Sequence, residues 1–307
     1  MTAGWTTRDI PDLSGAITIV TGASGGIGSQ IARELARKAA TVILACRSAG
    51  RGDATVEAIQ TEIPDARVEV MTVDLASLAS IRTFATTFRE RYDRLNLLVN
   101  NAGVLLAPYG TTEDGFERHF GINHLGHFAL TGLLIDRLLG ADGSRVVTVS
   151  SRGHTLGRID FADLMDQNGR RYSPARAYAR SKLANLLFTY ELQRKLPASS
   201  TIAVAAHPGG AATDLGRRMR ERRSYRTLLP LLEWLSQSAA AAALPILRAA
   251  TDPNVSGGEF YGPSGLLGMR GRPVKATSSR RSYDQTVAHR LWEVSEELTG
   301  VRFPRVS

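Results

Sequence analysis

The chain has 307 residues, of which 43% are hydrophobic and 22% charged, and this composition is ordinary for a globular protein with a sizeable core. Its single cysteine, Cys46, excludes an internal disulfide and gives no sign of an oxidising compartment. The net charge of +9 lies partly in the stretch Arg217–Arg226, which has no interleaved aromatic residues and no nucleic-acid motif. We therefore interpret this stretch as a solvated loop, favoured over a site for an anionic partner, and expect no nucleic-acid binding.

Targeting signals are absent from the printed sequence. The first residues, Met1–Asp12, lack the basic-then-apolar order of a signal peptide. The longest apolar run, Ala239–Leu247, is short and is interrupted by Pro245, so we expect no transmembrane segment. A cytoplasmic location is the default expectation.

Short β-branched runs alternate with helical patterns along most of the chain, as is typical of a parallel sheet with crossover helices. The expected strands are Ala16–Thr21, Thr41–Ala45, Arg67–Val73, Leu95–Asn100, Arg145–Ser150, Thr201–Ala206 and, more weakly, Glu259–Tyr261. The expected helices are Ile27–Lys38, Gly52–Ile63, Leu78–Tyr92, Phe116–Leu138, Ala175–Leu196 and Tyr283–Thr299. Several strands are apolar on both faces, as burial under helices on each side requires. The sequence thus predicts an α/β fold, a single doubly wound, Rossmann-type parallel sheet of about seven strands with helices on both faces, in one domain over residues 1–307.

A glycine-rich turn, Thr21–Gly28, directly follows the first expected strand and opens the first helix. A dinucleotide needs a tight turn, close approach of the backbone to its pyrophosphate, and free N–H groups at a helix N-terminus. Gly22, Gly26 and Gly28 have three residues between the first two glycines, where the commonest fingerprint has one. The position of the turn between strand and helix favours nucleotide binding over a purely structural turn.

The glycine spacing resembles that of the short-chain dehydrogenase/reductases, and four further blocks follow in the order found in that family. These blocks are Asn100–Gly103 after the fourth strand, Ser150–Ser151 after the fifth, Tyr178–Lys182 at the start of a helix, and His207–Gly209 after the sixth strand. Together they cover about residues 14–262. Residues 112–117, 121–128 and 177–185 resemble more narrowly the retinol-dehydrogenase-like branch, which also contains many bacterial oxidoreductases of unassigned substrate.

Tyr178 and Lys182 are four residues apart, so on a helix they project from one face, and a neighbouring ammonium lowers the pKa of a tyrosine by favouring the phenolate. The resemblance implies that Tyr178 is the general acid in carbonyl reduction and the general base in alcohol oxidation. It also implies that Lys182 holds the nicotinamide ribose, that Ser151 donates to the substrate oxygen, and that Asn123 holds a helix carbonyl and a water in the proton relay. The choice of Ser151 over Ser150 rests on the resemblance alone.

The end of the second strand bears on the choice between NAD and NADP. NAD-binding relatives carry a carboxylate there, about 20 residues past the glycines, for the ribose 2′-hydroxyl. Val42–Gly52 contains no acid, and Arg47 and Arg51 offer guanidinium groups suited to a 2′-phosphate, which favours NADP(H) over the alternative of two plain surface arginines. Asp74 matches the position that contacts the adenine amino group in this family. The full expected cofactor set is Gly22, Ser24, Gly26, Ile27, Gly28, Arg47, Arg51, Asp74, Leu75, Asn101, Ala102, Gly103, Tyr178, Lys182, Pro208, Gly209 and Thr213.

In this family the segment after the sixth strand closes over the nicotinamide, so we expect residues 214–236 to form a substrate lid. The second half of this segment is rich in leucine, contains Trp234, and has Glu233 as its only charge. This favours a small-molecule, lipophilic substrate, a bulky ketone or aldehyde of steroid, retinoid or aryl type. Core packing or a subunit contact in a homo-oligomer is an equal alternative for these leucines. Residues 263–307 are expected to form a C-terminal extension that ends in a helix.

Two departures from the resemblance stand out. Ser151 and Tyr178 are 27 positions apart (178 − 151), a longer connection than in compact relatives, although the retinol-dehydrogenase-like branch shares it. Ala39 ends the first helix where relatives often carry glycine; a positive φ there would cost on the order of 1 kcal/mol.

Other readings of the sequence stay open. His119, His124 and His127 lie close together on one expected helix, but no carboxylate or cysteine completes a set of ligands, so we expect no metal site. A dehydratase or epimerase usually has a different glycine spacing, whereas reduction of a carbon–carbon double bond remains an alternative. A non-catalytic nucleotide-binding protein on the same fold would typically lack Tyr178 or Lys182.

Overall fold

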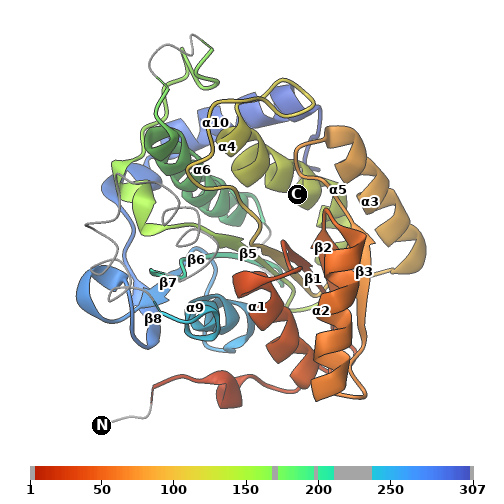
Figure 1. Ribbon diagram of the computed structural model, residues 1–307. Coiled ribbons are helices and arrows are strands. Elements are labelled where there is room, and N and C mark those ends of the chain that lie inside the picture. The colour runs from red at the N-terminus through yellow and green to blue at the C-terminus, as the bar shows by residue number, and fades with distance from the viewer. Residues whose placement is uncertain (1–3, 168–171, 197–199, 211–236, 305–307) are drawn as a thin grey trace.

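The computed structural model describes residues 4–167, 172–196, 200–210 and 237–304, and these form an eight-stranded sheet (Figure 1). The strands lie in the order β3-β2-β1-β4-β5-β6-β7-β8, and the first seven in the chain are parallel. Their bounds are β1 Ile17–Thr21, β2 Thr41–Cys46, β3 Val68–Thr72, β4 Leu97–Asn100, β5 Arg145–Val149, β6 Ile202–Ala206, β7 Phe260–Pro263 and β8 Pro273–Ala276. The α/β doubly wound fold predicted from the sequence is confirmed. The eighth strand was not expected; β8 is a four-residue edge strand that pairs antiparallel with β7.

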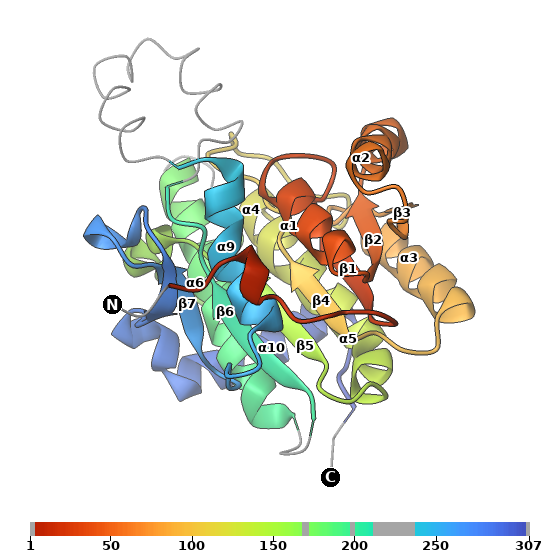
Figure 2. The same cartoon turned by 90° about the horizontal axis from the view of Figure 1, so that it is seen from below.

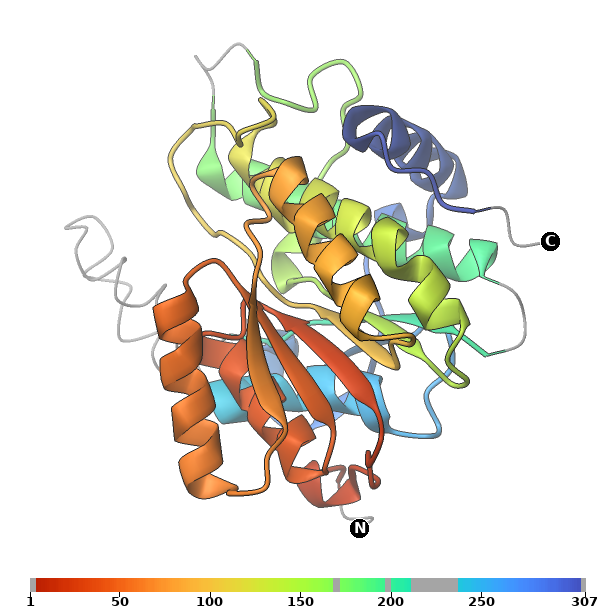
Figure 3. The ribbon, with the colours of Figure 1, turned by 90° about the vertical axis from the view of Figure 1, so that its right-hand side faces the viewer.

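Helices cover both faces of the sheet. The main helices are α1 Gly26–Arg37, α2 Ala49–Glu62, α3 Leu78–Arg91, α5 Gly126–Leu139, α6 Pro174–Lys195, α9 Ala239–Thr251 and α10 Gln285–Thr299. On one face α1 lies beside α9, as Figure 2 shows. On the other face α3 lies beside α5, and α10 packs on α6 (Figure 3). None of the described helices combines the length and the apolar character needed to cross a bilayer.

The alternation of side chains along the strands explains the two layers of the core. Val20 of β1 packs into the cluster beneath α1 and α9, whereas its neighbour Ile19 packs into the cluster beneath α3 and α5. Strands that are apolar on both faces therefore bury both rows of side chains under helices.

Three local features differ from, or add to, the sequence expectations. The expected helix over residues 116–138 is divided into α4 (Arg118–Phe120), a π-helical turn (Gly121–Leu125) and α5. The Ala-rich run around Pro245 forms helix α9, which the sequence analysis had not assigned. Ala39 takes a φ of 66°, the strained conformation that the missing glycine implies.

The strand order reverses between β1 and β4, which lie side by side in the sheet but far apart in the chain. In open α/β sheets the loops at the carboxyl ends of such neighbours diverge and leave a crevice where ligands bind. The glycine turn after β1 and Asn101 after β4 both lie at this crevice. The expected lid, the arginine stretch within it and Thr213 lie outside the described residues.

Candidate active site

The glycine turn and the loop after β4 pack tightly against each other. The Thr21 hydroxyl oxygen accepts hydrogen bonds from the backbone N–H of Asn101 (2.8 Å) and Ala102 (2.9 Å), and the Asn101 amide donates to the Thr21 carbonyl (2.7 Å). A Cβ at Gly22, whose φ is +67°, would lie 2.9 Å from the Ala102 Cα, and one at Gly28 would lie 2.4 Å from the Gly22 carbonyl oxygen. Both glycines are therefore required by close backbone approach.

A cleft of about 690 Å³ opens beside these two loops. Of the residues expected to bind the cofactor, its lining includes Gly22, Ser24, Gly26, Ile27, Gly28, Arg47, Arg51, Asp74, Leu75, Asn101, Ala102 and Gly103. Val104, Leu105 and Ile122 also line the cleft, and the sequence analysis missed them. Pro208 and Gly209 do not line it; they follow β6, where the Pro208 carbonyl accepts a hydrogen bond from Gln237 (2.8 Å).

The rim of the cleft is basic where β2 ends. Arg47 and Arg51 are both exposed and line the cleft, and the Ser48 side chain caps α2 between them. Among the described residues of the lining, Asp74, which follows β3, is the only carboxylate, and one of its oxygens accepts a hydrogen bond from the Ala76 N–H (2.9 Å). Cys46 is buried there as a free thiol that contacts the Ser48 carbonyl.

Tyr178 and Lys182 lie on the first turns of α6 and are not among the described residues that line the cleft. The Lys182 ammonium nitrogen lies 5.8 Å from the centre of the Tyr178 ring and donates to the Val149 carbonyl at 2.9 Å. A Cβ at Gly103 would lie 3.5 Å from this nitrogen, so Lys182 reaches the cleft lining. The helix begins here because Ser173 caps it and Pro174 occupies its first turn.

The structure distinguishes the two serines after β5. Ser151 hydrogen-bonds to the Tyr178 side chain. The Ser150 hydroxyl instead donates to the Lys182 carbonyl (2.8 Å) and is buried against α6. Ser151 is therefore the serine that shares the site with Tyr178.

The charge states at the site are governed by burial. Burial raises the pKa of Tyr178, and the Ser151 hydrogen bond offsets this rise only in part. Burial lowers the pKa of Lys182 to about 8. The expectation of a lowered Tyr178 pKa is wrong for this structure: the net pKa is raised, because desolvation of the phenolate outweighs the groups that favour it, and the Lys182 ammonium donates to the Val149 carbonyl.

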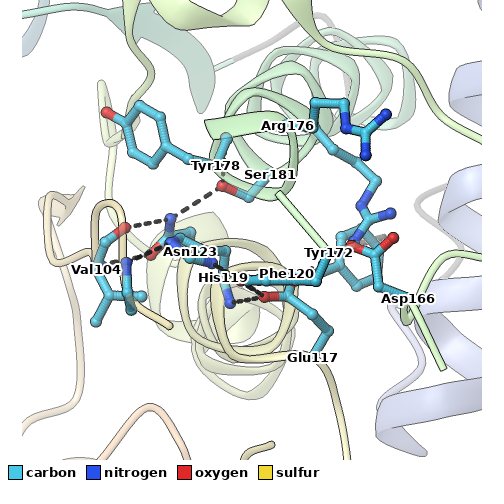
Figure 4. A network of polar contacts seen from close by, with 12 residues as sticks. Val104, Glu117, His119, Phe120, Asn123, Asp166, Tyr172, Arg176, Tyr178 and Ser181 are labelled. Atoms are coloured by element: carbon cyan, nitrogen blue, oxygen red, sulfur yellow. Dashed lines mark hydrogen bonds and ion pairs between the residues drawn. The ribbon is translucent and has the colours of Figure 1, made fainter. Parts of the chain in front are cut away.

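Asn123 lies in the π-helical turn and holds the loop after β4. Its side chain donates to the Val104 carbonyl (3.0 Å) and to the Ser181 hydroxyl (2.9 Å), and accepts from the Val104 N–H (2.8 Å), as Figure 4 shows. The Asn123 carbonyl accepts a hydrogen bond from the His127 ring (3.0 Å). Single π-helical turns of this kind often mark functional sites, because they displace a carbonyl from the helical pattern.

The three helical histidines have separate partners. His127 bonds to Thr21, His124 to Ser295, and His119 to Glu117. Burial lowers the pKa of His124 to about 3 and that of His127 to about 4, so both are neutral at neutral pH. Within the described ranges, no three histidine, cysteine or acidic side chains gather in a way that could hold a metal ion.

Comparison with known proteins agrees with this architecture. Residues 16–163 match the family model described as short chain dehydrogenase. Human retinol dehydrogenase 13 is 42% identical over 96% of this chain and 87% of its own length, and human retinol dehydrogenase 12 is 40% identical over 98% and 92%.

Solved structures are similar as well. An uncharacterised protein from Mycobacterium paratuberculosis superposes with a TM-score of 0.82 at 43% identity, covering 98% of this chain and all of that one. A blue fluorescent protein from a metagenomic library, solved with NADPH, gives a TM-score of 0.63 at 25% identity, covering 81% of this chain and 96% of that one. This chain belongs to the short-chain dehydrogenase/reductase family, in its retinol-dehydrogenase-like branch, and is an NAD(P)-dependent oxidoreductase.

Proposed function

We propose that this chain uses NADP(H) to interconvert a ketone or aldehyde and the corresponding alcohol on a bulky, mainly apolar substrate, with Tyr178 as the general acid and base. The observation that carries the proposal is the grouping of Tyr178, Ser151 and Lys182, with the Lys182 ammonium close to Gly103, which lines the glycine-rich cleft. The expected cofactor fits this cleft, because Gly22, Gly26 and Gly28 line it at the N-terminus of α1, where backbone N–H groups can face a pyrophosphate.

In the proposed mechanism the bound nicotinamide supplies or accepts the hydride. Ser151 donates a hydrogen bond to the substrate oxygen and stabilises the charge that develops on it. Tyr178 gives its hydroxyl proton to that oxygen during reduction and takes it back during oxidation. A tyrosine with a raised pKa is well suited to the acid role, since it stays protonated at neutral pH.

Lys182 has two tasks in this proposal. While protonated, it favours the tyrosinate that forms as Tyr178 releases its proton, and it holds the nicotinamide ribose hydroxyls. Asn123 positions the backbone of Val104 next to the same site.

The preference for NADP(H) rests on Arg47 and Arg51. Both side chains line the cleft at the end of β2, and the one acid among the described lining residues, Asp74, follows β3 instead. Two guanidinium groups would attract a 2′-phosphate, and the end of β2 carries no carboxylate that would repel it.

The experiment that tests the proposal follows the absorbance of NADPH and NADH with a panel of aryl ketones, aldehydes and polyhydroxylated carbonyl compounds. We expect NADPH oxidation that becomes faster as apolar groups are added to the substrate. Each buried methylene should raise kcat/KM by an amount equivalent to roughly 1 kcal/mol of transition-state stabilisation until the pocket is full. Rates that do not change with chain length, or that are highest for polyhydroxylated compounds, would contradict the proposed substrate class.

A further inference from the structure

A buried carboxylate and imidazole lie directly behind the Tyr178 ring, in a part of the molecule to which the proposed chemistry gives no role. Glu117 and His119 are both fully buried, and the rings of His119 and Tyr178 meet edge to face with their centres 6.3 Å apart. Figure 4 shows the pair below Tyr178, on the same helical segment as Asn123.

Glu117 fixes the orientation of the His119 ring. One carboxylate oxygen receives hydrogen bonds from the His119 Nδ1–H (3.0 Å) and from the Tyr172 hydroxyl (2.9 Å). The two oxygens also accept the backbone N–H groups of His119 and Phe120. Burial alone would raise the pKa of Glu117, but these hydrogen bonds outweigh it and hold the pKa below its ordinary value. The ionised carboxylate keeps the proton of the imidazole on Nδ1.

The other ring nitrogen then becomes an acceptor. His119 Nε2 accepts a hydrogen bond from the Ala107 N–H at 3.2 Å. Asn123, four residues later and therefore on the same helical face, binds both the N–H and the carbonyl of Val104. Residues 104–109, which we call the 104–109 loop, are thus held at two points by two side chains one helical turn apart.

The first two residues of this loop face the cleft. Val104 and Leu105 line the cleft. Leu106 has a φ of 49°, a conformation that a leucine adopts only when its surroundings impose it. The two attachments, at Val104 and at Ala107, lie on either side of Leu106 and account for this strain.

We propose that His119, oriented by Glu117, is a positioning residue that holds the 104–109 loop beside Tyr178 and thereby determines how tightly a bulky carbonyl substrate binds. The inference rests on the proposed function and names a specificity-determining contact of that same site. His119 packs against the edge of the Tyr178 ring, but the effect on substrate binding is proposed to act through the Ala107 backbone.

Two substitutions test the roles of the two ring nitrogens of His119 separately. In His119→Asn the amide can still donate to Glu117 from the position of Nδ1, but it leaves the Ala107 N–H without an acceptor. In His119→Gln the side-chain carbonyl reaches the position of Nε2 and can accept from Ala107. Tyr172→Phe serves as a control, because it removes the hydrogen bonds of the Tyr172 hydroxyl to Glu117 and to His119 Nδ1 but leaves the contact of His119 Nε2 with Ala107 in place.

The kinetic readout uses NADPH with a small aryl ketone and a tricyclic aryl ketone. For His119→Asn we expect KM for the tricyclic ketone to rise about tenfold, with kcat within about threefold of wild type and the Kd of NADPH within about twofold. His119→Gln and Tyr172→Phe should stay within about twofold of wild type on all three measures. Equal KM values in His119→Asn and His119→Gln, whether unchanged or raised together, would overturn the proposal.

Amide hydrogen exchange tests the same contact without turnover. The Ala107 amide should exchange at least about tenfold faster in His119→Asn than in wild type or His119→Gln, while the Val104 amide, held by Asn123, is unchanged. If His119→Asn does not fold, the wild-type protein decides: fast exchange at Ala107 beside slow exchange at Val104 would refute the contact. A wild-type enzyme that reduces no carbonyl would instead refute the proposed function. The exchange measurement would still test whether His119 holds the 104–109 loop.

Discussion

The cofactor side and the substrate side of the site are built in different ways. On the cofactor side, the turn after β1 and the loop after β4 are held by hydrogen bonds from backbone N–H groups to the Thr21 hydroxyl and by glycines that have no room for a Cβ. On the substrate side, the site is formed by ionisable side chains, among them the buried Lys182 and His119 and the partly buried Tyr178. The glycine turn on the cofactor side has a recognisable local spacing in the sequence, although it packs on a loop 80 residues further along the chain. On the substrate side, the contacts of His119 with Ala107 and Tyr172 leave no such local spacing. We therefore expect substitutions on the two sides to separate cofactor affinity from turnover.

The largest effect is expected where the two sides meet, at Lys182. Lys182→Ala should lower kcat by at least about 10² and also weaken NADPH binding, because the ammonium is proposed to serve both the tyrosine and the ribose. Stopped-flow turnover and calorimetric binding would measure the two effects. Lys195→Ala, on the last turn of the same helix, is the matched control and should change neither. Loss of turnover with unchanged NADPH affinity would contradict the proposal that Lys182 holds the nicotinamide ribose.

A substitution on the cofactor side should change affinity alone. Wild type should bind NADPH at least about tenfold more tightly than NADH, about 1.4 kcal/mol, and Arg47→Ser with Arg51→Ser should abolish most of this difference. Isothermal titration with both cofactors measures it. Arg67→Ser, an exposed arginine outside the cleft, should leave both affinities as they are. Equal affinity of the wild-type protein for NADH would refute the assignment.

The same comparison explains what could be predicted from the sequence. The strand–turn–helix at Thr21–Gly28 and the spacing of Tyr178 and Lys182 are local patterns, and both lie where expected. The Glu117–His119 pair could not be found in this way, because its partners Ala107 and Tyr172 lie 12 and 53 residues away along the chain from His119.

The charge states of the site residues could not be predicted from the sequence either. Four-residue spacing correctly places Lys182 near Tyr178, but it does not reveal that the Val149 carbonyl takes the ammonium. The short edge strand β8 and helix α9, with its internal Pro245, have weak local signals and are stabilised by packing on their neighbours.

A third expectation concerns pH. The pKa of Lys182 is lowered to about 8, so the ammonium is present below that pH and is lost above it. Because the pKa of Tyr178 is raised, the tyrosine stays protonated over the same interval. The kcat/KM for ketone reduction should therefore fall severalfold between about pH 7 and pH 9, with one inflection near 8. In Lys182→Arg the cation persists, so the residual rate should not fall over this interval; an identical inflection in that variant would assign it to another group.

The smallest effect concerns stability, away from both sides of the site. Ala39 is exposed and has a φ of 66°, so Ala39→Gly should stabilise the protein by about 0.5–1 kcal/mol by removing the Cβ strain. Ala54→Gly, at an exposed position inside α2, should instead destabilise it by about 1 kcal/mol. Urea unfolding of the two variants measures both changes; the same sign in each would show that the backbone at Ala39 is not strained.

The central claim is that Tyr178 transfers the proton in a carbonyl–alcohol interconversion, and Tyr178→Phe tests it most directly. This change removes only the hydroxyl group. With NADPH and an aryl ketone that the wild-type enzyme reduces, kcat should fall by at least about 10², while the Kd of NADPH stays within about twofold and the thermal unfolding midpoint is preserved. A variant that keeps near-wild-type kcat would contradict the account, because the proton would then come from another group.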